Sequence, residues 1–256
     1  MKLSKFEIAR ILWSVKIKKR LFRSRKEITQ KIFGYKVSAY SYRSFRILFR
    51  EVFLDHEYHF ISENHKPYII DCGANIGMAV IYFKMLYPDS HIIAFEPSPH
   101  AFKMLEKNVT QNNLKNVTIV NSALSDHEGK MSFYMDQSKD SLSSSLNPER
   151  GGSDEVSVNV EKLSSYISDR NFDLIKIDVE GGEWGIVEDL IQSKMIKNTK
   201  KYLVEYHHRI RPSSNRFAKF LQYFEENGFT YNLKTRYNNI GDFHDIFLHF
   251  YMETDS

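Results

Sequence analysis

The feature that most constrains this chain is a regular alternation of short β-rich runs and longer helical stretches, which begins at Pro67. The runs at 68–72, 91–96 and 117–121 are rich in β-branched and other apolar residues, and amphipathic stretches separate them. Strands that alternate with helical patterns of about 10 to 15 residues predict βαβ units and a parallel sheet covered on both faces. The sequence therefore predicts a Rossmann-like, doubly wound α/β fold.

The alternation has one interruption and an unusual end. Residues 126–152 contain a turn, a strand-like run and a Ser-rich stretch, which is typical of an inserted hairpin and loop. Candidate strands then follow at 172–178 and 202–206. The last two runs, 230–233 and 245–251, have no crossover helix between them, so they must pair antiparallel. We expect a mostly parallel sheet that finishes in an antiparallel hairpin.

The chain divides into an extension, 1–66, and a domain, 67–256, that differ in charge. Residues 1–50 carry 15 Lys and Arg against two acids, a net charge of +13, and the remainder carries −9. This asymmetry raises nucleic acid, a membrane surface and an acidic substrate as partners. Residues 3–23 have a helical pattern whose apolar residues fall on two opposite sides. We expect this helix to pack on both sides rather than to lie in a membrane interface.

The extension also predicts a short hairpin within 33–47, followed by a helical turn or two. Its apolar runs are too short for a membrane span of about 20 residues or a secretory signal of about 7 to 15. The single cysteine, Cys72, excludes an internal disulfide and favours a reducing compartment. We expect a cytoplasmic protein. Peripheral contact with an anionic membrane through residues 1–32, and the oligomeric state, are left open.

The turn after the first predicted strand has the features of a nucleotide site. It reads Asp-Cys-Gly-Ala-Asn-Ile-Gly from Asp71, and Gly73 and Gly77 allow a tight turn and close approach of a ligand. Asn75 stands where a dinucleotide fingerprint has its second glycine, which disfavours a nicotinamide-dependent oxidoreductase. Glu96 ends the next strand 25 residues after Asp71, near the spacing of about 20 at which an acid takes the hydroxyls of a ribose.

Three stretches together resemble the FkbM family of S-adenosylmethionine-dependent methyltransferases. They are Asp-Cys-Gly-Ala-Asn-Ile-Gly at 71–77, Ala-Phe-Glu-Pro at 94–97 and Ile-Asp-Val-Glu-Gly at 177–181, the last being the most specific. The resemblance extends over about residues 52–208. It implies a class I methyltransferase sheet of seven strands with an antiparallel last strand and S-adenosylmethionine as cofactor. It also implies methyl transfer to an oxygen, commonly on sugars, glycolipids or polyketide-like small molecules.

The resemblance implies a role for each matching position. Asp71 and Gly73 would face the methionine part of the cofactor. Asn75 and Gly77 would shape the turn beneath it, and Glu96 would take the ribose hydroxyls. The residues that would flank the adenine are Pro97, Ser98, Ser122 and Ala123.

Acids and histidines at the ends of the later strands are the candidates for chemistry. Ligands of a doubly wound sheet lie beyond the carboxyl ends of its strands, so Asp178 should border both the cofactor and the transferred methyl. An alcohol attacks well only when a base takes its proton. The candidates for this base are Glu180, Glu183, His207 and His208. His207 has a suitable ordinary pKa near 6.5, Glu180 belongs to the family motif, and Glu183 is more simply a helix N-terminal acid.

The sequence also offers a possible metal site and two alternative functions. Asp178, Glu180, Glu205 and His207 could bind Mg²⁺, but the resemblance does not require a metal and we expect none. The basic extension, with Tyr35, Tyr40 and Tyr42 for stacking, leaves an RNA ribose methyltransferase open, although we disfavour a nucleic-acid partner. A non-catalytic module that keeps the fold is disfavoured by the set Asp71, Glu96, Asp178 and Glu180. The Ser-rich run 141–146 is expected near the acceptor.

Overall fold

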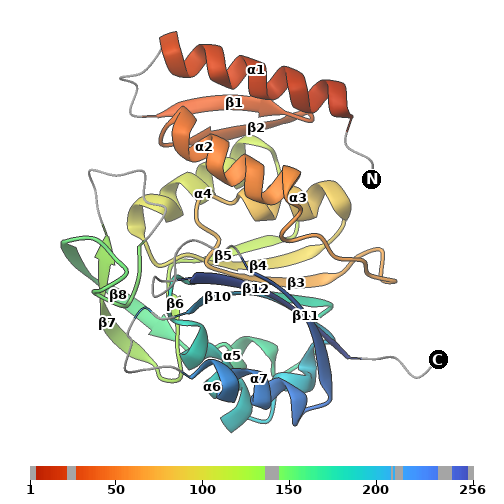
Figure 1. The fold of residues 1–256 in the computed structure, drawn as a ribbon, viewed down its shortest axis with the longest axis vertical. Helices are drawn as coiled ribbons and strands as arrows, with labels where there is room; N and C mark the ends of the chain where they lie inside the picture. The colour runs from red at the N-terminus through yellow and green to blue at the C-terminus, as the bar shows by residue number, and fades with distance from the viewer. Residues whose placement is uncertain are drawn as a thin grey trace.

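A computed structural model describes residues 4–21, 27–135, 144–208, 210, 216–235 and 244–252. Its centre is a seven-stranded sheet in the order β11-β12-β10-β9-β3-β4-β5 (Figure 1). The parallel strands are β3 (Tyr68–Cys72), β4 (His91–Phe95), β5 (Val117–Val120), β9 (Leu174–Ile177) and β10 (Lys201–His208). β12 (His244–Met252) lies between β10 and β11 (Phe229–Thr235) and is antiparallel to both. The predicted doubly wound sheet with an antiparallel last strand is confirmed.

Helices cover both faces of this sheet, as Figure 1 shows. One face carries α3 (Met78–Leu86) and α4 (Pro99–Gln111). The other carries α5 (Ser164–Ile167), α6 (Glu183–Gln192) and α7 (Phe217–Glu225), with the 3₁₀ turn η2 (Ile196–Asn198) after α6. The four residues of β9 are all buried, as expected for a strand with a helical layer on each side.

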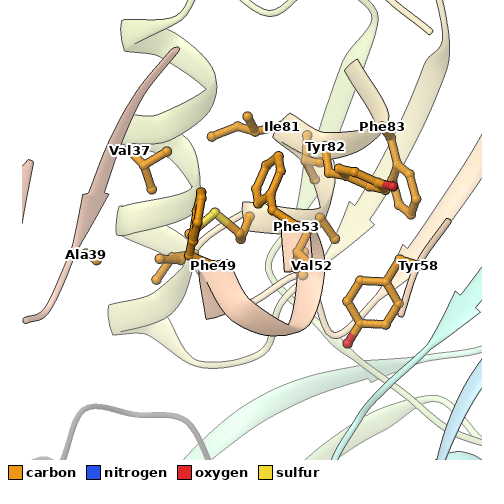
Figure 2. Packing of buried hydrophobic residues seen from close by; sticks show 14 of the residues in the cluster. Val37, Ala39, Phe49, Val52, Phe53, Tyr58, Ile81, Tyr82 and Phe83 are labelled. Carbon is orange, nitrogen blue, oxygen red and sulfur yellow. The ribbon is translucent and has the colours of Figure 1, made fainter. Parts of the chain in front are cut away.

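The extension forms a further layer over α3 and α4. It contains the hairpin β1 (Ile28–Ile32) and β2 (Tyr35–Ala39), then α2 (Tyr42–Phe49) and the π-helical turn η1 (Arg50–Leu54). Figure 2 shows Phe49 and Phe53 packed beside Val37 and Tyr82 in one hydrophobic cluster. The hairpin predicted within 33–47 is found at residues 28–39, a few residues earlier. Phe33 and Gly34 both have positive φ, 45° and 93°, which is the conformation of a two-residue hairpin turn.

The first helix, α1 (Lys5–Leu21), corrects the expectation of packing on two sides. Ile11 and Val15 are buried against the rest of the extension. The opposite side, with Phe6 and Trp13, faces solvent. Apolar residues on two sides of a helix predicted two packed faces, but the described chain supplies a neighbour for one face only.

A separate three-stranded sheet, in the order β6-β8-β7, projects beside the main one. β7 (Gly129–Met135) pairs antiparallel with β8 (Asp154–Glu161), and β6 (Ala123–Leu124) pairs parallel with β8. The predicted insert was a hairpin within 126–152, whereas β8 lies beyond it and was not anticipated. β8 alternates exposed residues with more buried ones along much of its length, so the sequence does contain a strand signal at these positions.

No helix within the described ranges combines the length and the apolar character needed to cross a membrane.

Candidate functional site

A cavity with a volume of about 290 Å³ lies at the carboxyl ends of the parallel strands, and we call it the main cavity because most of the predicted site residues line it. Its lining follows the strand order, from Ser122 after β5 and Glu96 after β4, through Gly73 after β3, to Asp178 after β9 and Glu205 in β10. Since neighbouring strands lie about 4.8 Å apart, the lining from β4 to β10 covers about 14 Å. We call the β4–β5 side the cofactor end and the β9–β10–β12 side the acid end.

Glu96 is the central polar side chain of the cofactor end. Its two carboxylate oxygens accept backbone N–H bonds of 2.8 Å, one from Asn75 and one from Ser98. Burial raises the pKa of Glu96 to about 7, against the lowering effect of these two hydrogen bonds. A carboxylate held by backbone groups at the edge of a nucleotide-sized cavity is well placed to accept hydrogen bonds from a ribose.

Gly73 lets the turn after β3 lie directly against the end of β9. Its φ is +82°, and a Cβ added there would come within 1.8 Å of the Asp178 carbonyl oxygen. Only glycine tolerates this conformation and this approach. The resulting cradle, with Glu96 beyond it, fits the S-adenosylmethionine that the resemblance implies.

A buried lysine connects the first turn to the acid end. Lys176, opposite Asp71 in the β3–β9 register, is only 2% exposed. Its ammonium donates to Asp71 Oδ1 and to the Gly73 carbonyl, both at 2.9 Å, and lies 3.5 Å from Asp178 Oδ2. Burial opposes the charge on Lys176, but the Asp71 and Asp178 carboxylates outweigh it and raise the pKa of the ammonium. Tyr58 donates to Asp178 Oδ2 at 2.8 Å, so Asp178 is held from two sides.

Glu180 and His207 form an ion-paired unit at the acid end. His207 lies between two carboxylates, with Nδ1 2.8 Å from Glu183 Oε1 and Nε2 3.1 Å from Glu180 Oε2. Burial lowers the pKa of His207, but Glu183 and Glu180 together raise it well above its usual value. Arg150 donates from Nε to the same Glu180 oxygen at 2.6 Å. The two carboxylates therefore favour the protonated form of His207, in which the ring has no lone pair to act as a base.

The backbone of Glu180 is in the left-handed region, with a φ of +57°. A non-glycine residue in this region stores conformational strain, which is commonly found where a functional side chain must be aimed. Here the strain follows from the turn between β9 and α6, and it directs Glu180 into the cavity lining.

Glu205 and Asp245 complete the acid end from β10 and β12. Burial, and then the neighbouring carboxylate of Asp178, raise the pKa of Glu205 well above its usual value. Burial also raises the pKa of Asp245, against the opposing effect of His207. The acid end therefore combines ion-paired carboxylates with two, Glu205 and Asp245, whose surroundings favour taking up a proton.

Two groups of possible metal ligands lie here, Asp178 with Glu180 and His207, and Glu205 with His207 and Asp245. His207 is common to both. A metal ligand must be a neutral imidazole with a free lone pair. Since the two neighbouring carboxylates raise the pKa of His207, a cation bound here would have to displace the proton that they favour on the ring.

Most of the residues predicted to hold the cofactor do line the cavity: Gly73, Asn75, Glu96, Pro97, Ser98, Ser122, Ala123 and Asp178. Asp71 and Gly77 are not in the lining. The Asp71 carboxylate is fully buried against Lys176, and Gly77 is the N-cap residue of α3, where an added Cβ would come within 2.7 Å of Leu105 Cδ1. Both act on the site through other residues.

Of the predicted catalytic residues, Asp178 and Glu180 line the cavity, and His207 lies behind Glu180. Glu183 is buried and accepts from Gly181 N–H as well as pairing with His207, so it is more than a helix-end acid. His208 packs on Phe217 instead.

Three functional side chains were missed from the sequence: Lys176, Tyr58 and Arg150. A lysine inside an otherwise apolar four-residue strand was a usable signal, because buried lysines need charged partners. Tyr58 lies 120 residues before its partner Asp178 in the sequence, and Arg150 lies 30 residues before its partner Glu180. Both belong to loops, and no local sequence pattern marks them.

Two further expectations concern the tyrosines of the extension, as stacking platforms, and the Ser-rich run 141–146. Tyr40 and Tyr42 are buried in the core, so they are not exposed stacking platforms for a nucleic acid. Of the Ser-rich run, 141–143 lie outside the described residues, while Ser144 and Leu146 line the cavity.

Comparison with protein families matches this chain to methyltransferases. The model of the methyltransferase FkbM domain matches residues 71–231, well over half of the chain. Methyltransferase sdnD of Sordaria araneosa is 28% identical over 175 residues, which cover 56% of this chain and 68% of the relative. The 31-O-demethyl-FK506 methyltransferase FkbM of Streptomyces tacrolimicus is 28% identical over 174 residues, covering 54% and 65%. The 2-O-methyltransferase NoeI of Sinorhizobium fredii (strain NBRC 101917 / NGR234) is 27% identical over 142 residues, covering 49% and 58%.

A solved structure gives the same fold. The crystal structure of methyltransferase FkbM from Methylobacillus flagellatus KT aligns with a TM-score of 0.52 at 15% identity, covering 79% of this chain and 48% of that one. The chain thus spans about two thirds of the length of its curated relatives and about half of this solved protein.

Proposed function

The chain belongs to the FkbM family of S-adenosylmethionine-dependent methyltransferases, and from this premise we propose that it methylates a hydroxyl oxygen of a sugar, a glycolipid or another small molecule. Two of the relatives are O-methyltransferases by name, one of them a 2-O-methyltransferase. The observation that carries the proposal is a single cavity in which Glu96 and a cluster of carboxylates lie along one sheet edge.

This arrangement suits transfer to a hydroxyl, which needs alignment and removal of one proton. When bound, S-adenosylmethionine supplies a methyl group on a positively charged sulfur. Glu96, Gly73 and Asn75 would hold this cofactor, and the excess of carboxylates at the acid end complements its positive charge.

We assign the proton acceptor to Glu205 and an orienting role to Glu180. The Glu180 carboxylate already pairs with Arg150 and His207, which fixes its position. Glu205 lines the same cavity, and its raised pKa makes it the stronger base once ionised. Tyr58 and Lys176 hold Asp178 in place in the lining of the same cavity.

A cytoplasmic enzyme of glycan or small-molecule biosynthesis is the setting that we propose. A chain with a single cysteine needs no oxidising compartment. The acceptor itself is to be found by a screen of sugars, glycolipids and small alcohols with methyl-labelled S-adenosylmethionine.

The test compares Glu205→Gln with Glu180→Gln on the acceptor found. Glu205→Gln should lower kcat by about 100-fold or more, with cofactor affinity unchanged, while Glu180→Gln should mainly raise the KM for the acceptor. In the wild type, kcat should fall as pH drops through the pKa of Glu205, which lies above its ordinary value near 4.5. Glu106→Gln, an exposed acid on α4, is the control.

Two results would contradict the proposal. Full turnover in Glu205→Gln with loss in Glu180→Gln would move the base to Glu180. Labelling of amines or of no hydroxyl acceptor across the screen would contradict O-methylation itself.

A further inference from the structure

The outer face of α1 is an apolar stripe open to solvent. Phe6 is 80% exposed, Trp13 and Leu21 are 68% exposed, and Ile17 is 37% exposed. Their spacings of seven, four and four residues place them on one side of a helix. We call these four residues the α1 stripe. Large apolar side chains gathered on one exposed face indicate a binding surface.

The α1 stripe is accompanied by basic side chains. At about 100° per residue, Arg10 and Arg20 project among the stripe residues, and Lys5 and Lys16 project along its edge. All four are exposed. α1 contains six Lys and Arg against one acid, Glu7, and it belongs to the +13 segment of residues 1–50.

We propose that α1 lies on an anionic membrane surface, with the α1 stripe in the headgroup–acyl boundary and the basic side chains against the lipid phosphates. A helix in such an interface needs an exposed apolar face and basic residues around it. Each Lys or Arg near an anionic leaflet strengthens binding by about fivefold. The inner face, with Ile11 and Val15, stays packed on the extension.

The composition of this face argues against two other occupants. A second copy of the chain, related by a two-fold axis, would bring this patch against itself. The basic side chains Arg10, Arg20 and Lys16 would then face basic side chains of the copy, and like charges would repel. A nucleic acid would use the basic side chains and could stack on aromatic rings, but it would leave the aliphatic Ile17 and Leu21 without a role.

The proposed surface adjoins the wall of the main cavity. α1 packs on α2, whose Ile47 and Leu48 line the cavity together with Glu51 of η1. Binding at α1 would therefore hold the α2 side of the cavity close to the lipid surface. The proposal does not depend on which acceptor is methylated, because membrane binding is measured without an acceptor.

The test uses the full chain and vesicles of phosphatidylcholine with or without phosphatidylglycerol. In a Trp184→Phe background, Trp13 is the only tryptophan left of the two in the chain. Its emission should shift to the blue with the anionic vesicles and shift much less with the neutral ones. In co-sedimentation, Phe6→Ser/Trp13→Ser should bind anionic vesicles at least about tenfold more weakly. Ile61→Ser, which removes an apolar side chain 71% exposed outside α1, should bind as the wild type does.

Thermal melting of each variant separates loss of binding from loss of fold. The proposal is overturned if the wild type does not bind anionic vesicles, or if Phe6→Ser/Trp13→Ser binds them equally well. A concentration-dependent dimer that this double variant abolishes, without vesicle binding, would assign the stripe to a second copy. Binding of a single-stranded oligonucleotide without vesicle binding would assign the basic face to nucleic acid.

Discussion

The two ends of the cavity are built in different ways. At the cofactor end, backbone N–H groups of Asn75 and Ser98 hold Glu96, and all three belong to turns that directly follow β3 and β4. At the acid end, side chains from four separated segments hold one another. Tyr58, Arg150, Asp178, Glu180 and His207 meet there from loops and strands up to 120 residues apart in the sequence.

The difference shows which parts of such a site can vary. Backbone groups in a fixed turn present the same donors whatever side chains surround them, so the cofactor end depends on turn geometry and on one carboxylate. The acid end depends on mutual charge compensation among buried side chains, where removal of one partner leaves another uncompensated. We therefore expect substitutions at the acid end to affect stability, and those at the cofactor end to affect cofactor affinity.

The largest effect is expected from Lys176→Met, which removes the ammonium between Asp71 and Asp178. The buried carboxylate of Asp71 and the partly buried carboxylate of Asp178 would lose their charged partner, and the free energy of unfolding should fall by about 3 to 5 kcal/mol. Denaturant unfolding measures this. Lys84→Met is the matched control, because Lys84 is also 2% exposed but donates to backbone carbonyls such as that of Ser90.

The double variant Lys176→Met/Asp71→Asn sharpens this prediction. Neutralising Asp71 should recover part of the lost stability, since the uncompensated charge is the cause. Equal losses in Lys176→Met and Lys84→Met, with no recovery in the double variant, would show that packing rather than charge holds this region.

A smaller effect, on cofactor binding, is expected from Gly73→Ala. The new Cβ would meet the Asp178 carbonyl oxygen at 1.8 Å, so the turn must move away from the end of β9. A displacement of this size should weaken binding of S-adenosylmethionine on the order of 100-fold, as measured by calorimetry. Gly228→Ala is the control, because it has nearly the same φ, +81°, with nothing within 4 Å of the added Cβ. Unchanged cofactor affinity in Gly73→Ala would place the cofactor elsewhere.

The smallest effect is expected from Glu96→Gln, which should weaken cofactor binding by about tenfold and leave kcat at saturating cofactor nearly unchanged. In the wild type, the pKa of Glu96 is raised to about 7, so cofactor affinity should be full above pH 7 and decline as pH falls through that value. The Gln variant should lose this pH dependence.

The stability of the cofactor-free protein should depend on the ionisation of Glu96 in the opposite direction to cofactor affinity. Since the folded-state pKa of Glu96 exceeds its ordinary value near 4.5, its contribution to stability is present below that value and is lost as pH rises through about 7. Glu96→Gln should therefore raise the melting temperature of the cofactor-free protein at pH 8. A lower melting temperature, together with unchanged cofactor affinity, would assign Glu96 a structural role.

Several features of the fold and site follow from local sequence patterns. The alternation after Pro67 predicted the parallel sheet, and the missing crossover helix before 245–251 predicted its antiparallel end. The turn residues Gly73 and Asn75 and the strand-end acid Glu96 were predictable because backbone conformation and strand ends are properties of a few adjacent residues.

What only the tertiary structure decided is which distant side chains meet and which apolar faces find a partner. The sequence offered His207 as a base by its ordinary pKa, but its position between Glu180 and Glu183 raises that pKa and favours the protonated ring. The pattern of α1 predicted two packed faces, and the fold supplied a neighbour for one. Charge compensation and burial depend on all the neighbours that folding brings around a side chain. Many of these neighbours are distant in the sequence, so local residue spacing does not predict them.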